Sequence, residues 1–145
     1  MGAHITSTIV IARPVSEVFE YILNFDTNGP KWATDVESVE KTSDGPVGSG
    51  TTFAQVQKVM GKQRNTTLKF VEIDPNRSIK AEAELGPMSP RVTLSVERAD
   101  EGTQVTVDGD ANPHGFFKLL SPIASRQGRR LWDARLSSLK RVLES

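Results

Sequence analysis

The chain has 145 residues, of which 37% are hydrophobic and 25% are charged, and its 18 basic and 18 acidic side chains give a net charge of zero. A chain of this length forms one ordinary domain that buries roughly 70% of the surface of its unfolded state. The balanced charge gives no general attraction to nucleic acid or to an anionic membrane, and the lack of cysteine in the sequence excludes disulfides and thiolate chemistry.

The N-terminal segment does not have the pattern of a targeting sequence. Residues 1–12 contain no basic stretch followed by an apolar one, and no apolar run reaches the roughly 18 residues that a membrane span requires. We therefore expect a cytoplasmic protein without a membrane span, made of a single domain over residues 1–145.

A strand and then a helix are predicted first. Residues 5–11 alternate between a row rich in isoleucine and a row of threonine and valine, which is typical of a strand. Pro14 suits the first position of a helix, and apolar residues then recur at helical spacing, with Tyr21 off that stripe and expected at the surface. Asn28-Gly29-Pro30 predicts the end of this helix, with at most one further turn before a short strand over residues 36–41.

From residue 51 to residue 112 the pattern predicts antiparallel strands joined by short turns. The turn sequences are Gly61-Lys62, Asp74-Pro75-Asn76, Gly86-Pro87 and Asp100-Glu101-Gly102. Residues 79–85 and 92–97 alternate cleanly between apolar and polar side chains. One face of the sheet is therefore expected to contact water.

Small side chains recur on the face of the sheet that is expected to be dry. They are Ala81, Ala83, Gly109 and Ala111, beside Val107 on the last strand, and Gly128 faces them from the C-terminal helix. Because a dense interior normally avoids voids, a helix over these positions either packs very close or leaves room for a guest molecule. Both alternatives stay open.

A long basic helix is predicted over the last third of the chain, with a break at Pro122. At 100° per residue its apolar side chains gather on one side, and most of its cations lie opposite, as on a solvated surface. Arg135 is the exception, because it lies near the centre of the apolar stripe, with Gly128 two turns before it.

Two interpretations of Arg135 are open. A guanidinium in a core pairs with a carboxylate from the sheet or extends along its stem to water. Alternatively, Arg135 binds a carboxylate, phosphate or enolate of a ligand, or stabilises a developing oxyanion during a cyclisation or dehydration.

The order of one strand, one or two helices, six strands and a long helix predicts an α+β domain in which a curved antiparallel sheet grips the last helix. In this order the chain resembles the START-like, polyketide cyclase/dehydrase type of the helix-grip superfamily called SRPBCC. The resemblance covers nearly the whole chain. It is carried by residues 12–19, Trp32 with Asp35-Val36, residues 45–51, Asp74-Pro75, residues 102–106, residues 116–122 and residues 139–144.

The resemblance implies a helix-grip fold, with a curved seven-stranded antiparallel sheet around a long C-terminal helix and one or two short helices after the first strand. It also implies a deep, mostly apolar pocket between sheet and helix, used across the superfamily for lipids, polyketides, sterols or plant hormones. It does not imply one reaction, since such folds host many functions.

No catalytic constellation is recognisable. His4 and His114 are the only histidines, and neither belongs to a nucleophile pattern or has the spacing of a metal site. We therefore expect no catalytic residue, no metal and no cofactor. His114 is expected in the connection before the last helix, either as an ordinary loop residue or as a titratable group near a ligand at the pocket mouth.

Aromatic and amide side chains complete the set of pocket candidates. Trp32 and Trp132 either pack in the core or contact the ligand, and Trp132 is the better wall candidate because it shares the stripe of Arg135. Gln55 lies on one strand face with Phe53 and Gln57, but the opposite face is equally apolar, so the sequence leaves open which one points inward. The candidates are Trp32, Phe53, Gln55, Ala81, Ala83, Val107, Gly109, His114, Gly128, Trp132 and Arg135.

The main functional hypothesis is a protein that binds a small hydrophobic molecule, lipid-like or polyketide-like, with a polar or anionic end. The alternatives are a polyketide cyclase/dehydrase acting in the same pocket and a protein-interaction module that uses the basic helix face. We expect a monomer or homodimer that does not bind nucleic acid.

Overall fold

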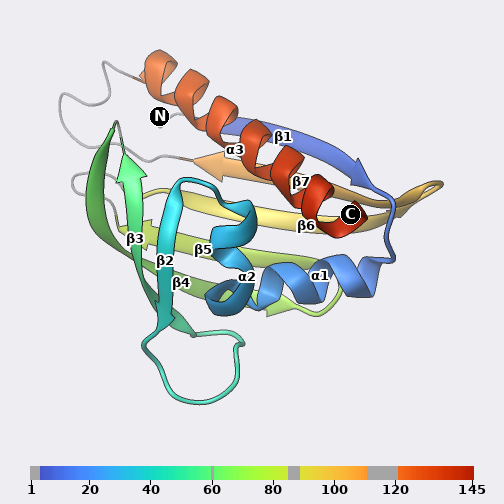
Figure 1. Cartoon of the computed structure of the whole chain (residues 1–145), viewed down its shortest axis with the longest axis horizontal. Helices are drawn as coiled ribbons and strands as arrows, with labels where there is room; N and C mark the ends of the chain where they lie inside the picture. Colours follow the sequence, from blue (N-terminus) through green and yellow to red (C-terminus); the bar gives the residue numbers. More distant parts are fainter. Residues whose placement is uncertain (1–3, 60, 85–88, 111–120) are drawn as a thin grey trace.

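Seven antiparallel strands and three helices make up the part of the chain that this computed structural model describes, residues 4–59, 61–84, 89–110 and 121–145 (Figure 1). The elements are β1 (His4–Ile11), α1 (Val15–Leu23), α2 (Phe25–Trp32), β2 (Val36–Lys41), β3 (Thr52–Val59), β4 (Lys62–Asp74), β5 (Ser78–Glu84), β6 (Arg91–Ala99), β7 (Gly102–Asp110) and α3 (Ser121–Glu144). The expected α+β helix-grip architecture is confirmed.

The strands form a single sheet in the order β1-β7-β6-β5-β4-β3-β2. From β2 to β7 every strand pairs with its neighbour in sequence, so this part is a meander. Helices α1 and α2 carry the chain from β1 at one edge to β2 at the other (Figure 1). The long helix α3 then runs across the sheet beside β1.

One face of the sheet is apolar and points toward the helices. The strand register aligns Ile5, Gly109, Val92, Ala81 and Phe70 in a row across this face, and all of them except the half-buried Val92 are buried. Polar side chains occupy the alternate positions of the same strands and are mostly exposed. This alternation confirms that one face of the sheet contacts water.

Helix α3 is held against β1 along much of its length. Ile5 lies between two glycines: a Cβ atom on Gly109 would come 3.0 Å from Ile5 Cγ1, and one on Gly128 would come 3.5 Å from Ile5 Cγ2. The small residues here allow the helix to approach the sheet edge closely. Toward the C-terminal end of α3, Lys140 Nζ donates to Val10 O at 2.8 Å. The helix is therefore held to β1 by apolar packing near Ile5 and by a hydrogen bond near Val10.

The predicted helix end at Asn28-Gly29-Pro30 is wrong. The first helix ends at Leu23, and Pro30 lies inside α2. A proline inside a helix removes one backbone hydrogen bond, which is why Pro30 favours the end of a helix. Here the buried side chains of Phe25 and Trp32 stabilise the short helix against the sheet despite this loss. Gly29 faces the Phe25 ring, where a Cβ would come 2.9 Å from Cε1.

Other expectations at the C-terminal end fall partly outside the described residues. Helix α3 begins at Ser121 with Pro122 in its first turn, where a proline is tolerated. The segment before it, which would decide whether the helix changes direction there, lies outside the described residues, as do His114 and Ala111.

Gly102 gives a direct test of this fold. Its φ is 146°, and a Cβ atom there would lie 2.2 Å from the carbonyl oxygen of Ile11. Gly102→Ala should therefore lower the free energy of unfolding by about 1–3 kcal/mol in urea titrations. Gly48→Ala is the matched control, because a Cβ at Gly48 meets nothing within 4 Å, and it should change stability by less than about 1 kcal/mol. Equal stability of the two variants would contradict the strained turn.

Candidate functional site

A chain of polar side chains joins α3 to the inward face of the sheet. Arg135 Nε donates to Asp35 Oδ1 at 2.7 Å, and Arg135 Nη2 donates to Asp35 Oδ2 at 2.6 Å. Gln57 Nε2 donates to the same Oδ2 at 2.8 Å, and Thr66 Oγ1 donates to Gln57 Oε1 at 3.3 Å. The network therefore runs from α3 through the α2–β2 connection to β3 and β4.

The backbone places these groups. Asp35 lies directly before β2, and its carbonyl accepts a hydrogen bond of 2.8 Å from Lys58 N, which fixes the connection against β3. Val36 pairs with Gln57 across β2 and β3. On α3 the helical spacing brings Arg135 over the ring of Trp132, with Cζ 4.6 Å from the ring centroid.

The ion pair is buried, and its electrostatics favour the charged form. The side chains of Arg135 and Asp35 are 10% and 11% exposed. Burial raises the pKa of the Asp35 carboxyl, but the hydrogen bonds and positive charge of Arg135, with the hydrogen bond from Gln57, outweigh it, so that pKa lies below its ordinary value. Arg135 thus has a protein carboxylate as its partner, which comes from the connection before β2 rather than from a strand.

Five aromatic rings pack beside this network. Phe25 of α2 contacts Trp32 and Phe53 with ring centroids 6.1 and 5.8 Å apart, and Phe53 contacts Phe70 at 4.9 Å. Trp32 also lies 6.2 Å from Trp132 on α3. Edge-on and tilted rings at these distances stabilise a packed cluster. Trp32 is 1% exposed and part of the core, whereas Trp132 is only half-buried.

The inward face of β3 is now identified. Phe53, Gln55 and Gln57 are buried while Ala54 is exposed, so the glutamines point inward. Gln55 therefore lies between an aromatic ring of the cluster and a member of the polar network. Its Oε1 atom and the Nε1 atom of Trp32 are buried and have no hydrogen-bond partner in the described part of the chain. The structure brings together five of the sequence candidates here: Trp32, Phe53, Gln55, Trp132 and Arg135.

The other candidates lie elsewhere on the inner face or beyond the described residues. Ala81 and Val107 are buried, and Ala83 is half-buried. Gly109 and Gly128 lie beside Ile5 at the contact between helix and sheet, where their small size serves close packing. His114 lies outside the described residues.

Sequence reasoning missed Asp35 and misplaced Tyr21. Gln57 was expected beside Gln55 at the pocket wall if their strand face pointed inward, and that face does point inward. Tyr21, expected at the surface, is half-buried, its hydroxyl is buried without a partner, and burial raises its pKa. Within the described residues there is no cluster of three or more histidine, cysteine, aspartate or glutamate side chains that could hold a metal ion.

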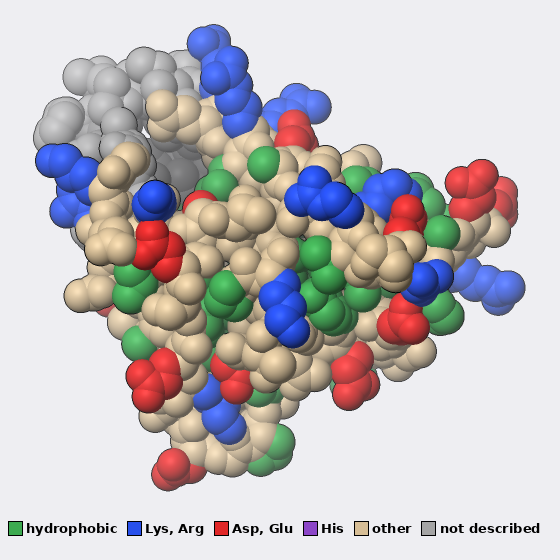
Figure 2. Space-filling view, in the orientation of Figure 1, with side chains coloured by type: hydrophobic (Ala, Val, Ile, Leu, Met, Phe, Trp, Pro, Cys, Tyr) green, Lys and Arg blue, Asp and Glu red, His purple; other side chains and the backbone are tan. Residues whose placement is uncertain are grey.

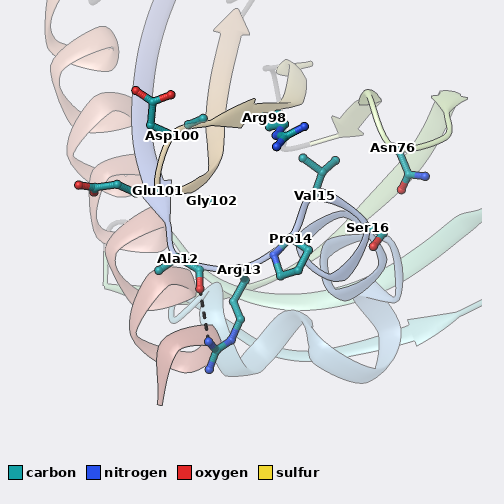
Figure 3. A pocket seen from close by; sticks show the side chains of 11 residues that line it. Ala12, Arg13, Pro14, Val15, Ser16, Asn76, Arg98, Asp100, Glu101 and Gly102 are labelled. Atoms are coloured by element: carbon teal, nitrogen blue, oxygen red, sulfur yellow. Dashed lines mark hydrogen bonds between the residues drawn. The ribbon is translucent and has the colours of Figure 1, made fainter.

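The surface has two hollows, of which the larger lies away from this site and the smaller is lined in part by Phe53, Leu68 and Ala83. The larger, about 680 Å³, lies where the β1–α1 connection meets the β6–β7 turn (Figure 3). Arg13 and Arg98 border it, but Figure 3 shows their side chains pointing in different directions, and Arg13 is held by Ala12 O at 3.3 Å and Glu17 at 3.2 Å. The smaller, about 420 Å³, is lined mainly by side chains of the polar outer face of β3, β4 and β5.

The chain matches known proteins in sequence and in fold. A family model described as polyketide cyclase/dehydrase and lipid transport matches residues 2–144. The sequence has no significant match among functionally curated proteins. In the described residues, no helix is long and apolar enough to cross a membrane.

Solved structures share the fold at low sequence identity. A START superfamily protein from Mycobacterium smegmatis superposes with a TM-score of 0.82 at 13% identity, covering 99% of this chain and 98% of that chain. Ara h 8.0201 gives 0.77 at 17% identity, with both chains fully covered. DynU16, a putative protein of the dynemicin biosynthetic locus, gives 0.74 at 16% identity, covering 100% of this chain and 48% of that chain. At these identities the similarity shows the fold alone.

Removal of Arg135 tests the ion pair. Arg135→Ala leaves the buried Asp35 carboxylate without its cation and should lower the free energy of unfolding by about 3–5 kcal/mol. Urea unfolding measures this effect. The control Arg130→Ala removes an exposed arginine of the same helix and should change stability by less than about 0.5 kcal/mol. A small loss in Arg135→Ala would contradict the structural role of the pair.

The same pair predicts a dependence of stability on pH. Because the folded-state pKa of Asp35 is depressed, its stabilisation is complete above the ordinary value of 3.8 and is lost as pH falls through the lower folded value. The difference in unfolding free energy between the unmodified protein and Asp35→Asn should therefore narrow below pH 3.8. A difference that stays constant down to about pH 2 would contradict this assignment.

Proposed function

This chain belongs to the polyketide cyclase/dehydrase and lipid transport family, and we propose that it binds a small hydrophobic molecule between the inward face of its sheet and α3. The observation that carries the proposal is a group of apolar side chains, Leu68, Ala83 and Val92, that point inward but are only half-buried. Inward neighbours on the same strands, such as Phe70 and Ala81, are buried. Incomplete coverage at this end supports room for a guest.

The chemistry of the surroundings favours an apolar guest. Leu68 lies between Phe53 and Ala83 in the strand register, so the half-buried positions adjoin the aromatic cluster. Trp132, half-buried on α3, adds a large apolar surface beside Trp32 of the same cluster. Figure 2 shows hydrophobic side chains at the surface between α3 and the helices α1 and α2.

Binding is better supported than catalysis. A cyclase or dehydrase needs an acid or base near its substrate in a usable protonation state. Asp35 and Arg135, the ionisable pair that borders the aromatic cluster, hold each other in a two-point contact, and the carboxylate also accepts from Gln57. A binding protein needs only a fitting shape and a polar anchor, and the half-buried inward positions of β4, β5 and β6 support the first of these.

Enlargement of Ala83 tests the proposed space. Ala83→Leu should be tolerated within about 1 kcal/mol in stability, since it adds apolar atoms to incompletely covered space, and should weaken binding of the neutral fluorophore Nile red, measured by fluorescence titration. Ala54→Leu makes the same change on the exposed face of β3 and should leave Nile red binding unaltered.

The opposite result would argue against this pocket. If the interior next to Ala83 is already filled, the added side chain should cost about 1–3 kcal/mol through overpacking. Such a loss with unchanged Nile red binding would remove the main support for a hydrophobic ligand at this place.

A further inference from the structure

Three buried side-chain atoms have no hydrogen-bond partner among the described residues: the hydroxyl of Tyr21, Nε1 of Trp32 and Oε1 of Gln55. Two of them, the indole Nε1 of Trp32, a residue that is 1% exposed, and the amide Oε1 of Gln55, a residue that is 6% exposed, belong to the aromatic cluster and the adjoining strand. More than about 90% of buried polar groups in proteins have a partner, because an unpaired one loses its bond to water without replacement. An unpaired donor and an unpaired acceptor in one region point to a molecule that bonds both.

Both atoms belong to the region of the interior between the aromatic cluster and the polar network, which we call the corner. Trp32 contacts Phe25, and Phe25 contacts Phe53, which is two residues from Gln55 on the inward face of β3. On the other side Trp32 contacts Trp132. Trp132 stacks with Arg135, and the polar network leads back through Asp35 to Gln57, again two residues from Gln55. Two routes of side-chain contacts, one through the aromatic rings and one through Arg135 and Asp35, thus connect Trp32 with the strand segment that carries Gln55.

The corner adjoins the apolar space proposed for the ligand. Across the sheet from Phe53, Leu68 and then Ala83 follow in the register, and both are half-buried. Gln55 pairs with Thr66 in the next row of the same face. A hydrophobic molecule lying over Leu68 and Ala83 would therefore reach the corner with one end.

The guanidinium of Arg135 does not make this corner a site for an anion. Its Nε and Nη2 atoms are taken by the two oxygens of Asp35, and the buried pair as a whole is neutral. A ligand carboxylate would gain no uncompensated positive charge and would still have to lose its water. This argues against the anionic ligand end that the sequence alone left open.

We propose that the ligand carries an uncharged hydroxyl group at the end that enters this corner. A hydroxyl oxygen accepts a hydrogen bond from Trp32 Nε1–H, and the same group donates its hydrogen to Gln55 Oε1. A carboxylate or a ketone has no hydrogen to donate to Gln55, and an ammonium has no lone pair for the indole. The inference rests on the proposed hydrophobic pocket and names the chemistry of its ligand.

The experiment compares ligands of equal length by displacement of Nile red. The probes are 1-decanol, 2-decanone and decanoate at pH 8, where the acid is ionised. We expect the unmodified protein to bind 1-decanol about three- to tenfold more tightly than 2-decanone, the factor that one net hydrogen bond supplies, and to bind decanoate most weakly.

Two variants and a control assign the preference to the corner. Gln55→Leu removes the acceptor that only the alcohol can use, and it should reduce the preference for 1-decanol over 2-decanone to about twofold or less. Trp32→Phe removes the donor that both ligands can use, so it should weaken the binding of both and leave the preference for 1-decanol in place. Gln55→Leu should also leave the ligand-free protein equally or more stable to urea, because it removes an unpaired buried group. Gln104→Leu makes the same substitution at an exposed position and should preserve the preference.

The outcomes separate this inference from the pocket itself. Saturable Nile red binding with equal displacement by decanol and decanone, or with the same preference in Gln55→Leu, overturns the hydroxyl site and leaves the pocket intact. Tighter binding of decanoate than of decanol overturns it in favour of Arg135. Failure of Nile red to bind at all overturns both proposals.

Discussion

The buried pair of Arg135 and Asp35 is the interaction on which the rest of the interior depends. It joins α3 to the connection before β2, so two elements separated by 100 residues in sequence meet at one point. Removing either partner would leave the other charge without compensation in a place from which water is largely excluded. The pair also sets the position of Trp132 and Gln57, and through them the edges of the aromatic cluster. The charged Arg135 in the apolar stripe of α3 thus fixes the position of this helix relative to the connection before β2.

The sequence predicted the architecture well because its signals were local and repeated. Alternation in the strands and turn sequences such as Asp74-Pro75-Asn76 agree with the observed sheet. The local reading failed at Pro30, where packing of a short helix overrides the preference of the residue. The site was predictable only in part. The apolar stripe identified Arg135 as unusual, but its partner Asp35 has no pattern of its own, since it lies in a connection and becomes visible only when the fold brings it beside α3. The sheet face to which Gln55 points likewise could not be predicted, because it depends on how the strands pair.

The interior has one densely packed region and one region in which inward-facing side chains are incompletely covered. Near Ile5, two glycines let α3 approach β1 closely, and that region is dense. Around Leu68 and Ala83, inward-facing side chains remain half-buried, and the neighbouring corner holds unpaired polar atoms. Dense packing beside β1 keeps the helix in place, which allows the space over β4 and β5 to remain incompletely filled without loss of the fold. Stability and the proposed binding are thus assigned to different parts of one helix–sheet contact.

The pairing of β1 with β7 has a consequence for how the chain reaches its native state. The pairing joins residues about a hundred positions apart, such as Thr6 and Asp108, which are 102 positions apart, and Ala12 N donates to Glu144 Oε2 at 2.8 Å. The meander from β2 to β7 can form from neighbouring segments, whereas β1 must find a partner across almost the whole sequence. Because α3 rests on β1, the last helix has no complete surface to dock on until this long loop has closed. We therefore expect docking of α3 to be a late event in folding, and an early collapsed chain would expose the apolar face of the meander to neighbouring molecules.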